Sequence, residues 1–270
     1  MSDLLKFLQE NEVDVKSETE MYNLKELDLS ANDLTTLPKE IGNLINLKEL
    51  NLSDNILTTL HDSLPEENST SSIYNLINLE KLYLAGNNLT TLPKEIGTLT
   101  KLEELHISNN RLTTLPKEIG NLINLKEIFL YCNKLTFLPP ELGNLINLED
   151  LDLWDNNLTA LPSEFGNLTN LKILGLSYNP ITTLPLGIDR LPKNLFPARL
   201  YKSYDESVKF RKSVKIIERA WIVYDSLSDL DFVDWIPNSE GIARFAERTR
   251  LRCAKRSFRE LQESNPEIFS

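Results

Sequence analysis

The sequence predicts an α/β repeat solenoid, a coil in which each repeat adds one short strand to a parallel sheet. The first observation is the frame L-x-x-L-x-L-x-x-N-x-L, which occurs seven times and places its Asn at positions 32, 55, 87, 110, 133, 156 and 179. The second is that LPKEIGNLINL appears twice without change, starting at Leu37 and at Leu115. Successive frames are 23 residues apart, except for one step of 32. A fixed period of this length indicates one structural unit stacked on itself.

The residues of each frame have separate structural tasks. In the first frame, Leu27 and Leu29 point to one side of the strand and Asp28 to the other. One repeat cannot bury its leucines alone, whereas stacked repeats bury them as a continuous column. We expect the frame Asn to turn the chain inward and to satisfy buried backbone groups with its amide. The Leu-Pro step then ends strand pairing, and the I-G-x-L stretch is expected to form a helical turn.

This frame resembles the leucine-rich repeat family, in the 23-residue subtype with the pattern LPxxIxxL. The resemblance covers about residues 22–192 in seven units. It implies a horseshoe with its parallel strands on the concave face.

Both ends of the solenoid need caps, because a bare end would expose the leucine column. Residues 1–21 are predicted to form a helical cap, with a helix at 2–10 that begins after Ser2. Residues 193–270 are predicted to form two helices, either as a cap or as a small domain. The long step between frames places a nine-residue insertion within 61–72. It is predicted to be a tolerated loop or, alternatively, a loop that contacts a partner.

Composition excludes several classes of function. The 270 residues carry a net charge of −11, which argues against binding to nucleic acid or to an anionic membrane. No apolar run is long enough to span a bilayer, and the N-terminus lacks the features of a secretory signal. We therefore expect a cytoplasmic protein without a membrane span.

The sequence contains no recognisable catalytic or metal-binding motif. Two Cys and two His do not supply the ligand spacing of a zinc site, and no glycine-rich phosphate loop is present. The expected protein is not an enzyme and has no metal and no cofactor.

The outward strand positions are the best candidates for function, because they do not support the leucine column. The first row holds Asp28, Asn51, Tyr83, His106, Phe129, Asp152 and Gly175. The second row holds Ser30, Ser53, Ala85, Ser108, Tyr131, Trp154 and Ser177. The third row holds Glu26, Glu49, Lys81, Glu104, Glu127 and Asp150.

Aromatic side chains gather in the middle of these rows. A solvated strand face has no structural need for aromatic residues, and exposed clusters of them are typical of interfaces. The predicted contact core is Tyr83, His106, Phe129, Tyr131 and Trp154, with Glu127, Asp150 and Asp152 among the acidic residues around it. We expect a protein partner with Lys or Arg around an apolar patch. The alternatives are that the C-terminal tail folds back over these side chains, or that they only pack on each other.

The setting of this binding is predicted from weaker signals. Glu260, Glu263 and Glu267 precede Ile268 and Phe269, which resembles the C-terminal signal of type IV-secreted bacterial effectors. We therefore predict an effector that acts on a host protein. The alternative is a scaffold or a small-GTPase-binding regulator in its own cell. The oligomeric state is left open.

Overall fold

The computed structural model describes residues 2–60, 73–200, 202–203, 205–209 and 212. The chain divides into two compact units, Met1–Tyr201 and Lys202–Ser270. The predicted insertion at 61–72 lies outside the described residues, and so does most of the tail that is predicted to form two helices. Across the described ranges, no helix is long and apolar enough to cross a membrane.

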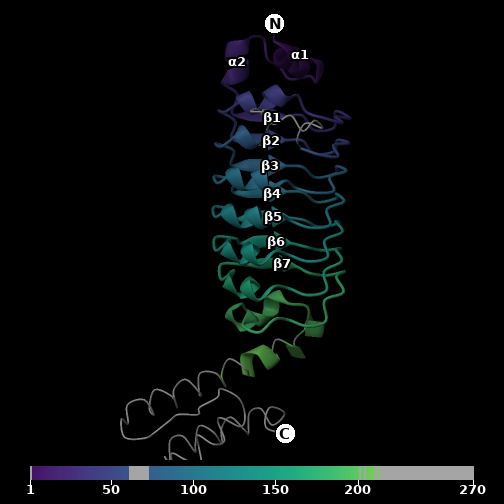
Figure 1. Cartoon of the computed structure of the whole chain (residues 1–270), viewed down its shortest axis with the longest axis vertical. Coiled ribbons are helices and arrows are strands. Elements are labelled where there is room, and N and C mark those ends of the chain that lie inside the picture. The colour runs from purple at the N-terminus through teal and green to yellow at the C-terminus, as the bar shows by residue number, and fades with distance from the viewer. Residues whose placement is uncertain (1, 61–72, 201, 204, 210–211, 213–270) are drawn as a thin grey trace, which may run out of the picture. The chain divides into compact units, whose positions relative to one another are not determined.

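The first unit begins with two short helices at the end of the stack where the N-terminus lies (Figure 1). Helix α1 (Asp3–Glu10) follows Ser2, whose hydroxyl accepts a hydrogen bond from the backbone N–H of Leu5 at 3.4 Å. This confirms the predicted first helix and its capping residue. Helix α2 (Glu18–Tyr22) was not predicted, and its Met21 is completely buried.

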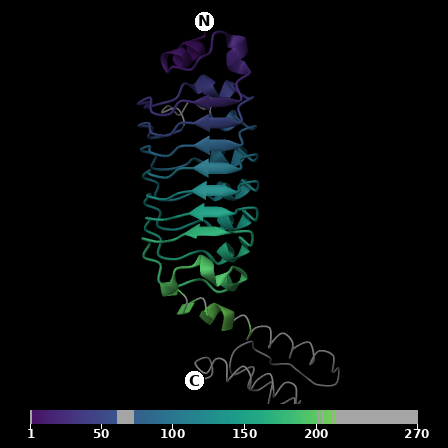
Figure 2. The same ribbon diagram turned by 180° about the vertical axis from the view of Figure 1, so that it is seen from behind.

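Seven parallel strands form one sheet in chain order, and Figure 2 shows them stacked one below another. They are β1 (Glu26–Asp28), β2 (Glu49–Asn51), β3 (Lys81–Tyr83), β4 (Glu104–His106), β5 (Glu127–Phe129), β6 (Asp150–Asp152) and β7 (Ile173–Gly175). The register joins equivalent residues of successive repeats, so that Leu105 pairs with Ile128. Leu50 pairs with Leu82 across the insertion, which therefore leaves the sheet intact. The predicted repeat solenoid is confirmed.

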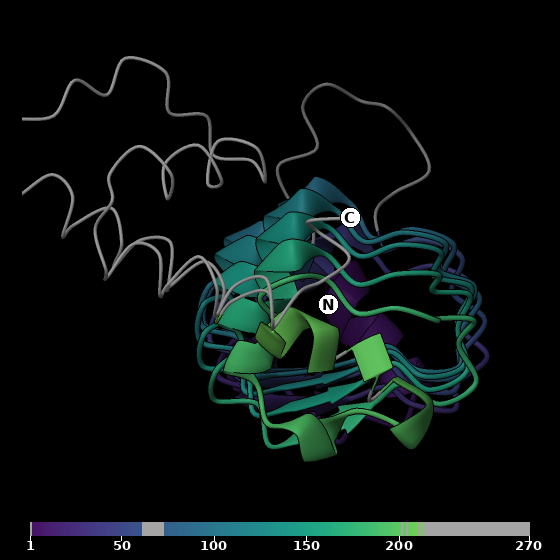
Figure 3. The same cartoon turned by 90° about the horizontal axis from the view of Figure 1, so that it is seen from below.

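A short 3-10 helix follows the strand in most repeats and lies on a different side of the coil (Figure 3). These helices are η1 (Lys39–Asn43), η2 (Ile73–Asn75), η3 (Lys94–Thr98), η4 (Lys117–Asn121), η5 (Pro140–Asn144) and η6 (Ser163–Asn167). Five of the six follow a proline in extended conformation, such as Pro116 before η4. The predicted helical turn is therefore confirmed, as a 3-10 helix whose Ile, Leu or Phe side chain is buried.

The first unit ends in three further 3-10 turns, two of which lie beyond residue 192. These are η7 (Ile188–Arg190), η8 (Lys193–Leu195) and η9 (Ala198–Leu200). Phe196 and Leu200 are buried. The compact unit therefore reaches Tyr201, and residues 193–200 pack as part of it.

A ladder of asparagine side chains ties each repeat to the one before it. Asn133 donates from Nδ2 to the carbonyl oxygens of Ile107 at 2.9 Å and Leu130 at 3.0 Å. Its Oδ1 accepts a hydrogen bond from the backbone N–H of Leu112 at 3.0 Å. Equivalent bonds recur at the other buried frame asparagines, so the amide satisfies backbone groups as predicted.

The residue before each frame Asn adopts a left-handed backbone conformation. Its φ is positive in all seven repeats, at positions 31, 54, 86, 109, 132, 155 and 178. Only Gly86 is a glycine, the residue that tolerates this conformation without strain. The other repeats hold larger residues there, including Cys132 and Tyr178.

Candidate functional site on the strand face

We define the strand face as the outward side chains of β1 to β7 together with those that follow each strand before the frame Asn. The sheet register places Tyr83 beside His106, His106 beside Phe129, and Phe129 beside Asp152. The neighbouring row places Glu104 beside Glu127 and Glu127 beside Asp150. The predicted site residues therefore occupy adjacent strands of one face.

Three of the predicted residues have rings in contact along the first row, tilted between Tyr83 and His106 and stacked between His106 and Phe129. The ring centroids of Tyr83 and His106 lie 4.8 Å apart, and those of His106 and Phe129 lie 4.3 Å apart. All three side chains are half-buried, and the Nε2 atom of His106 is buried without a hydrogen-bond partner. Burial lowers the pKa of His106, which favours the neutral imidazole at pH 7.

A second aromatic pair lies further along the stack. Trp154 is 38% exposed, and its ring meets that of Tyr178 edge-on at a centroid distance of 5.3 Å. Tyr178 is 73% exposed and was missed by the sequence analysis. It occupies the left-handed position before a frame Asn, one residue after the second row of outward side chains. Tyr131 belongs to the same row as Trp154 and is half-buried.

Glu104 is the centre of a charged network at one side of the aromatic stack. It accepts a hydrogen bond from the hydroxyl of Tyr83 at 2.8 Å and forms an ion pair with Lys81 at 2.8 Å. Burial, followed by the hydrogen bond to Glu104, raises the pKa of Tyr83 to about 12. Burial acts to raise the pKa of Glu104, but the bonds from Lys81 and Tyr83 outweigh it and lower the value.

The neighbouring carboxylates lack such a partner. Among the described residues, no lysine or arginine forms an ion pair with Glu127, Asp150 or Asp152. Burial, then the charge of Glu127, then that of Asp152 raise the pKa of Asp150. This part of the strand face therefore carries uncompensated negative charge.

Asp152 also has a structural task that the sequence analysis did not assign. Its Oδ1 accepts a hydrogen bond from the backbone N–H of Trp154 at 2.9 Å. Asp28 and Asn51 make the same bond to the N–H two residues on. In the repeats between them the position holds Tyr83, His106 and Phe129, and none of these three described side chains makes this bond. The aromatic residues therefore stand where the fold favours a capping acceptor.

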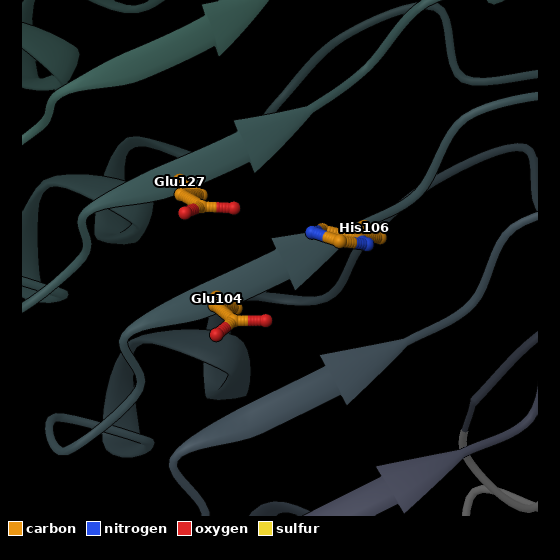
Figure 4. Close-up of side chains that lie close together, drawn as sticks. All are labelled: Glu104, His106 and Glu127. Atoms are coloured by element: carbon orange, nitrogen blue, oxygen red, sulfur yellow. The ribbon is translucent and has the colours of Figure 1, made fainter.

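The structure also gathers Glu104, His106 and Glu127, with one ligand atom of each within 4.8 Å of the others. Glu104 and His106 come from β4 and Glu127 from β5, and they project from the same face (Figure 4). The cluster lacks the Cys and His spacing of a zinc site, so the sequence analysis missed it. The signal was the 23-residue period, since it makes residue 127 the neighbour of residue 104.

Exposed apolar side chains are not confined to the strand face. Four isoleucines that follow the 3-10 helices are each more than half exposed: Ile45, Ile77, Ile123 and Ile146. They occupy a regular position of the repeat unit. The strand face differs because its aromatic residues break the repeat pattern and lie beside carboxylates.

Comparison with known proteins identifies the repeat. A family model described as leucine-rich repeat region matches residues 57–175, and a second, described as Leucine Rich Repeat, matches residues 23–44 and 46–67. No curated protein matches the chain.

Several solved structures are similar to this chain. A leucine-rich repeat protein of Leptospira interrogans is 37% identical over 66% of this chain and 50% of its own length, with a TM-score of 0.53. The ectodomain of the Arabidopsis thaliana receptor kinase GASSHO1/SCHENGEN3, in complex with CASPARIAN STRIP INTEGRITY FACTOR 2, is 37% identical over 65% of this chain and 21% of its own. The plant peptide hormone receptor RGFR1, in complex with RGF2, is 32% identical over 63% of this chain and 27% of its own length. Both receptors also have a TM-score of 0.53.

The chain thus spans half the length of the leptospiral protein and about a quarter or less of the two receptor chains. Apart from residues 61–72, the matched regions lie in the described repeats, where the strand register and the asparagine ladder recur. Residues 23–44 and 46–175 of the chain are leucine-rich repeats.

Proposed function

We propose that the chain is a non-enzymatic interaction module that binds a partner protein on its strand face. The observation that carries this proposal is the aromatic cluster over β3 to β7, which the fold does not require. At Tyr83, His106 and Phe129 the aromatic residue replaces a side chain that would cap the turn. Aromatic side chains of this kind are the usual binding hot spots of protein interfaces.

The solved relatives support the same role. The two plant receptors similar to this chain are each in complex with a partner, CASPARIAN STRIP INTEGRITY FACTOR 2 or RGF2. Leucine-rich repeats hold outward side chains on a fixed backbone, so different sequences on that face serve different partners.

The charges of the strand face indicate the chemistry of the partner. Glu127, Asp150 and Asp152 lie beside the aromatic residues without a described cationic partner. A surface with Lys or Arg around an apolar patch would complement them. We therefore expect binding to weaken as the salt concentration rises.

Affinity capture from a cell lysate, followed by measurement of the dissociation constant, tests the proposal. The variant Tyr131→Asp/Trp154→Asp should lower affinity about a hundredfold, because it places charge in the contact core. Ser30→Asp/Ser53→Asp is the matched control, since it adds two charges to the same row in two adjacent earlier repeats. Equal affinity of the two variants would contradict the proposal, provided that circular dichroism shows both to be folded.

We further propose a bacterial effector that acts on a host protein as the setting of this binding. The similarity to the leptospiral protein and the acidic, hydrophobic C-terminal residues support it. A translocation assay with a reporter fused to the chain tests it, and absence of the reporter from host cytosol would contradict it. Capture of a small GTPase in only one nucleotide state would favour a regulator instead.

A further inference from the structure

The cluster of Glu104, His106 and Glu127 has the geometry of a metal site. One oxygen or nitrogen of each residue lies within 4.8 Å of the others, and a Zn²⁺ ion lies about 2.1 Å from each such ligand. Small side-chain rotations therefore suffice to bring the three atoms onto one ion. The residues stand on paired strands, so the backbone positions are already fixed (Figure 4).

His106 is suited to act as the nitrogen ligand. Its ring lies between those of Tyr83 and Phe129, which hold it in one orientation. Its Nε2 atom is buried without a hydrogen-bond partner, and a buried polar atom of this kind is unfavourable until it finds one. The neutral imidazole carries the lone pair that a metal needs.

The two carboxylates contribute charge and orientation. The Tyr83 hydroxyl donates to Oε2 of Glu104, the kind of support that orients metal-binding carboxylates. Glu127 forms no ion pair with a described lysine or arginine, and Asp150 and Asp152 add negative charge next to it. The site therefore attracts a cation.

Lys81 is the competitor for this site. Its Nζ lies 2.8 Å from Oε1 of Glu104, and its side chain is 40% exposed. An exposed ion pair contributes little, so the flexible lysine can turn to solvent when a divalent ion binds Glu104.

We propose that Glu104, His106 and Glu127 bind one divalent first-row transition-metal ion, with Zn²⁺ as the probe of choice. The imidazole favours Zn²⁺ over Mg²⁺, which prefers oxygen ligands alone. Three protein ligands leave coordination positions open on the outer side for water or another group. This inference replaces the sequence-based expectation that the protein has no metal, and it does not depend on the proposed partner.

Isothermal titration of the full chain with Zn²⁺, after treatment with a chelator, tests the proposal. We expect the wild type to bind one ion per chain. His106→Ala should bind Zn²⁺ with at least about tenfold lower affinity, because it removes one of the three ligands. Lys81→Met should raise affinity about twofold to fivefold, because it removes the competing cation. Mg²⁺ at the same concentrations should give no measurable binding.

Matched controls separate this site from the other metal-binding side chains. His61→Ala removes the only other histidine and Cys132→Ser removes a free thiol, and both should bind Zn²⁺ as the wild type does. Glu127→Gln keeps the shape of the side chain, and it should abolish the visible absorption of bound Co²⁺. The proposal is overturned if His106→Ala or Glu127→Gln binds Zn²⁺ as tightly as the wild type, or if no Zn²⁺ binds to the wild-type chain.

Discussion

The strand face of β1 and β2 differs from that of β3 to β6, although both lie on the same backbone. Both regions share the buried leucines, the frame asparagines and the parallel register. The earlier region carries the small polar pairs Asp28 with Ser30 and Asn51 with Ser53. The later region carries aromatic side chains with Glu127 and Asp150 beside them.

The difference teaches that the inward and outward residues are under separate constraints. The side chains of Asp28 and Asn51 accept a hydrogen bond from a backbone N–H of the turn that follows. The residues of the earlier region are therefore explained by the needs of the fold. Phe129 gives up that bond and gains a stacking contact with His106. The later region therefore indicates a function that the fold alone does not explain.

The comparison requires that both regions rest on the same scaffold. Asn55→Ala and Asn133→Ala should each lower the free energy of unfolding by about 3 kcal/mol, because each leaves buried backbone groups without partners. Urea denaturation measures both. A loss confined to one of the two variants would show that the regions are built differently. Asn124→Ala is the control, since its single bond is exposed and should change stability little.

Phe129→Asn converts one position of the later region into the residue found in β2. The new side chain is able to cap its turn while the stack with His106 is lost, so stability should change by less than about 1 kcal/mol. Affinity for the partner should fall about tenfold, as for a hot-spot residue. Thermal unfolding and partner titration on the same sample measure the two effects. A large fall in stability without a fall in affinity would assign Phe129 to the scaffold.

Asp28→Asn and Asp150→Asn should change stability in opposite directions at pH 7. Hydrogen bonds from Ser30 hold the pKa of Asp28 below its ordinary value of 3.8, so its charge stabilises the fold above that pH. Burial and the charges of Glu127 and Asp152 raise the pKa of Asp150, so its charge destabilises the fold. Because solvent screens both charges, the changes are small. Asp28→Asn should lower the free energy of unfolding, and Asp150→Asn should raise it, by a few tenths of a kcal/mol, about the size of a surface charge effect.

The pH dependence separates these two aspartates further. The contribution of Asp28 is present above its unfolded pKa and is lost as the pH falls through its lowered folded value. The penalty at Asp150 is complete above its raised folded pKa and disappears as the pH falls from that value to the unfolded pKa. Urea denaturation between pH 7 and about pH 3 measures both differences. Shifts of the same sign in both variants would contradict the contrast between the two regions.

The repeat period was sufficient to predict the seven strands, the outward rows and the tasks of the frame Asn. The strands follow from the alternation of inward and outward side chains. Their register follows from the 23-residue period, as the pairing of Leu105 with Ile128 shows. Helix α2 was missed because five residues give little helical periodicity. Tyr178 was missed because its left-handed backbone brings a residue outside the strand rows next to Trp154.

The chemistry between strands was harder to predict than the strands. The contacts of Glu104 with Tyr83 and Lys81 depend on side-chain rotamers, which the repeat period does not determine. The insertion at 61–72 and most of the tail that is predicted to form two helices lie outside the described residues and stay predictions.

The most direct test of the account is a parallel measurement of affinity and stability in Trp154→Ser. Serine occupies this position in four other repeats, at 30, 53, 108 and 177, so the scaffold should accept it. The account predicts that affinity for the captured partner falls at least about tenfold while the free energy of unfolding changes by less than about 0.5 kcal/mol. Unchanged affinity, or a loss of stability large enough to explain the fall in binding, would contradict it.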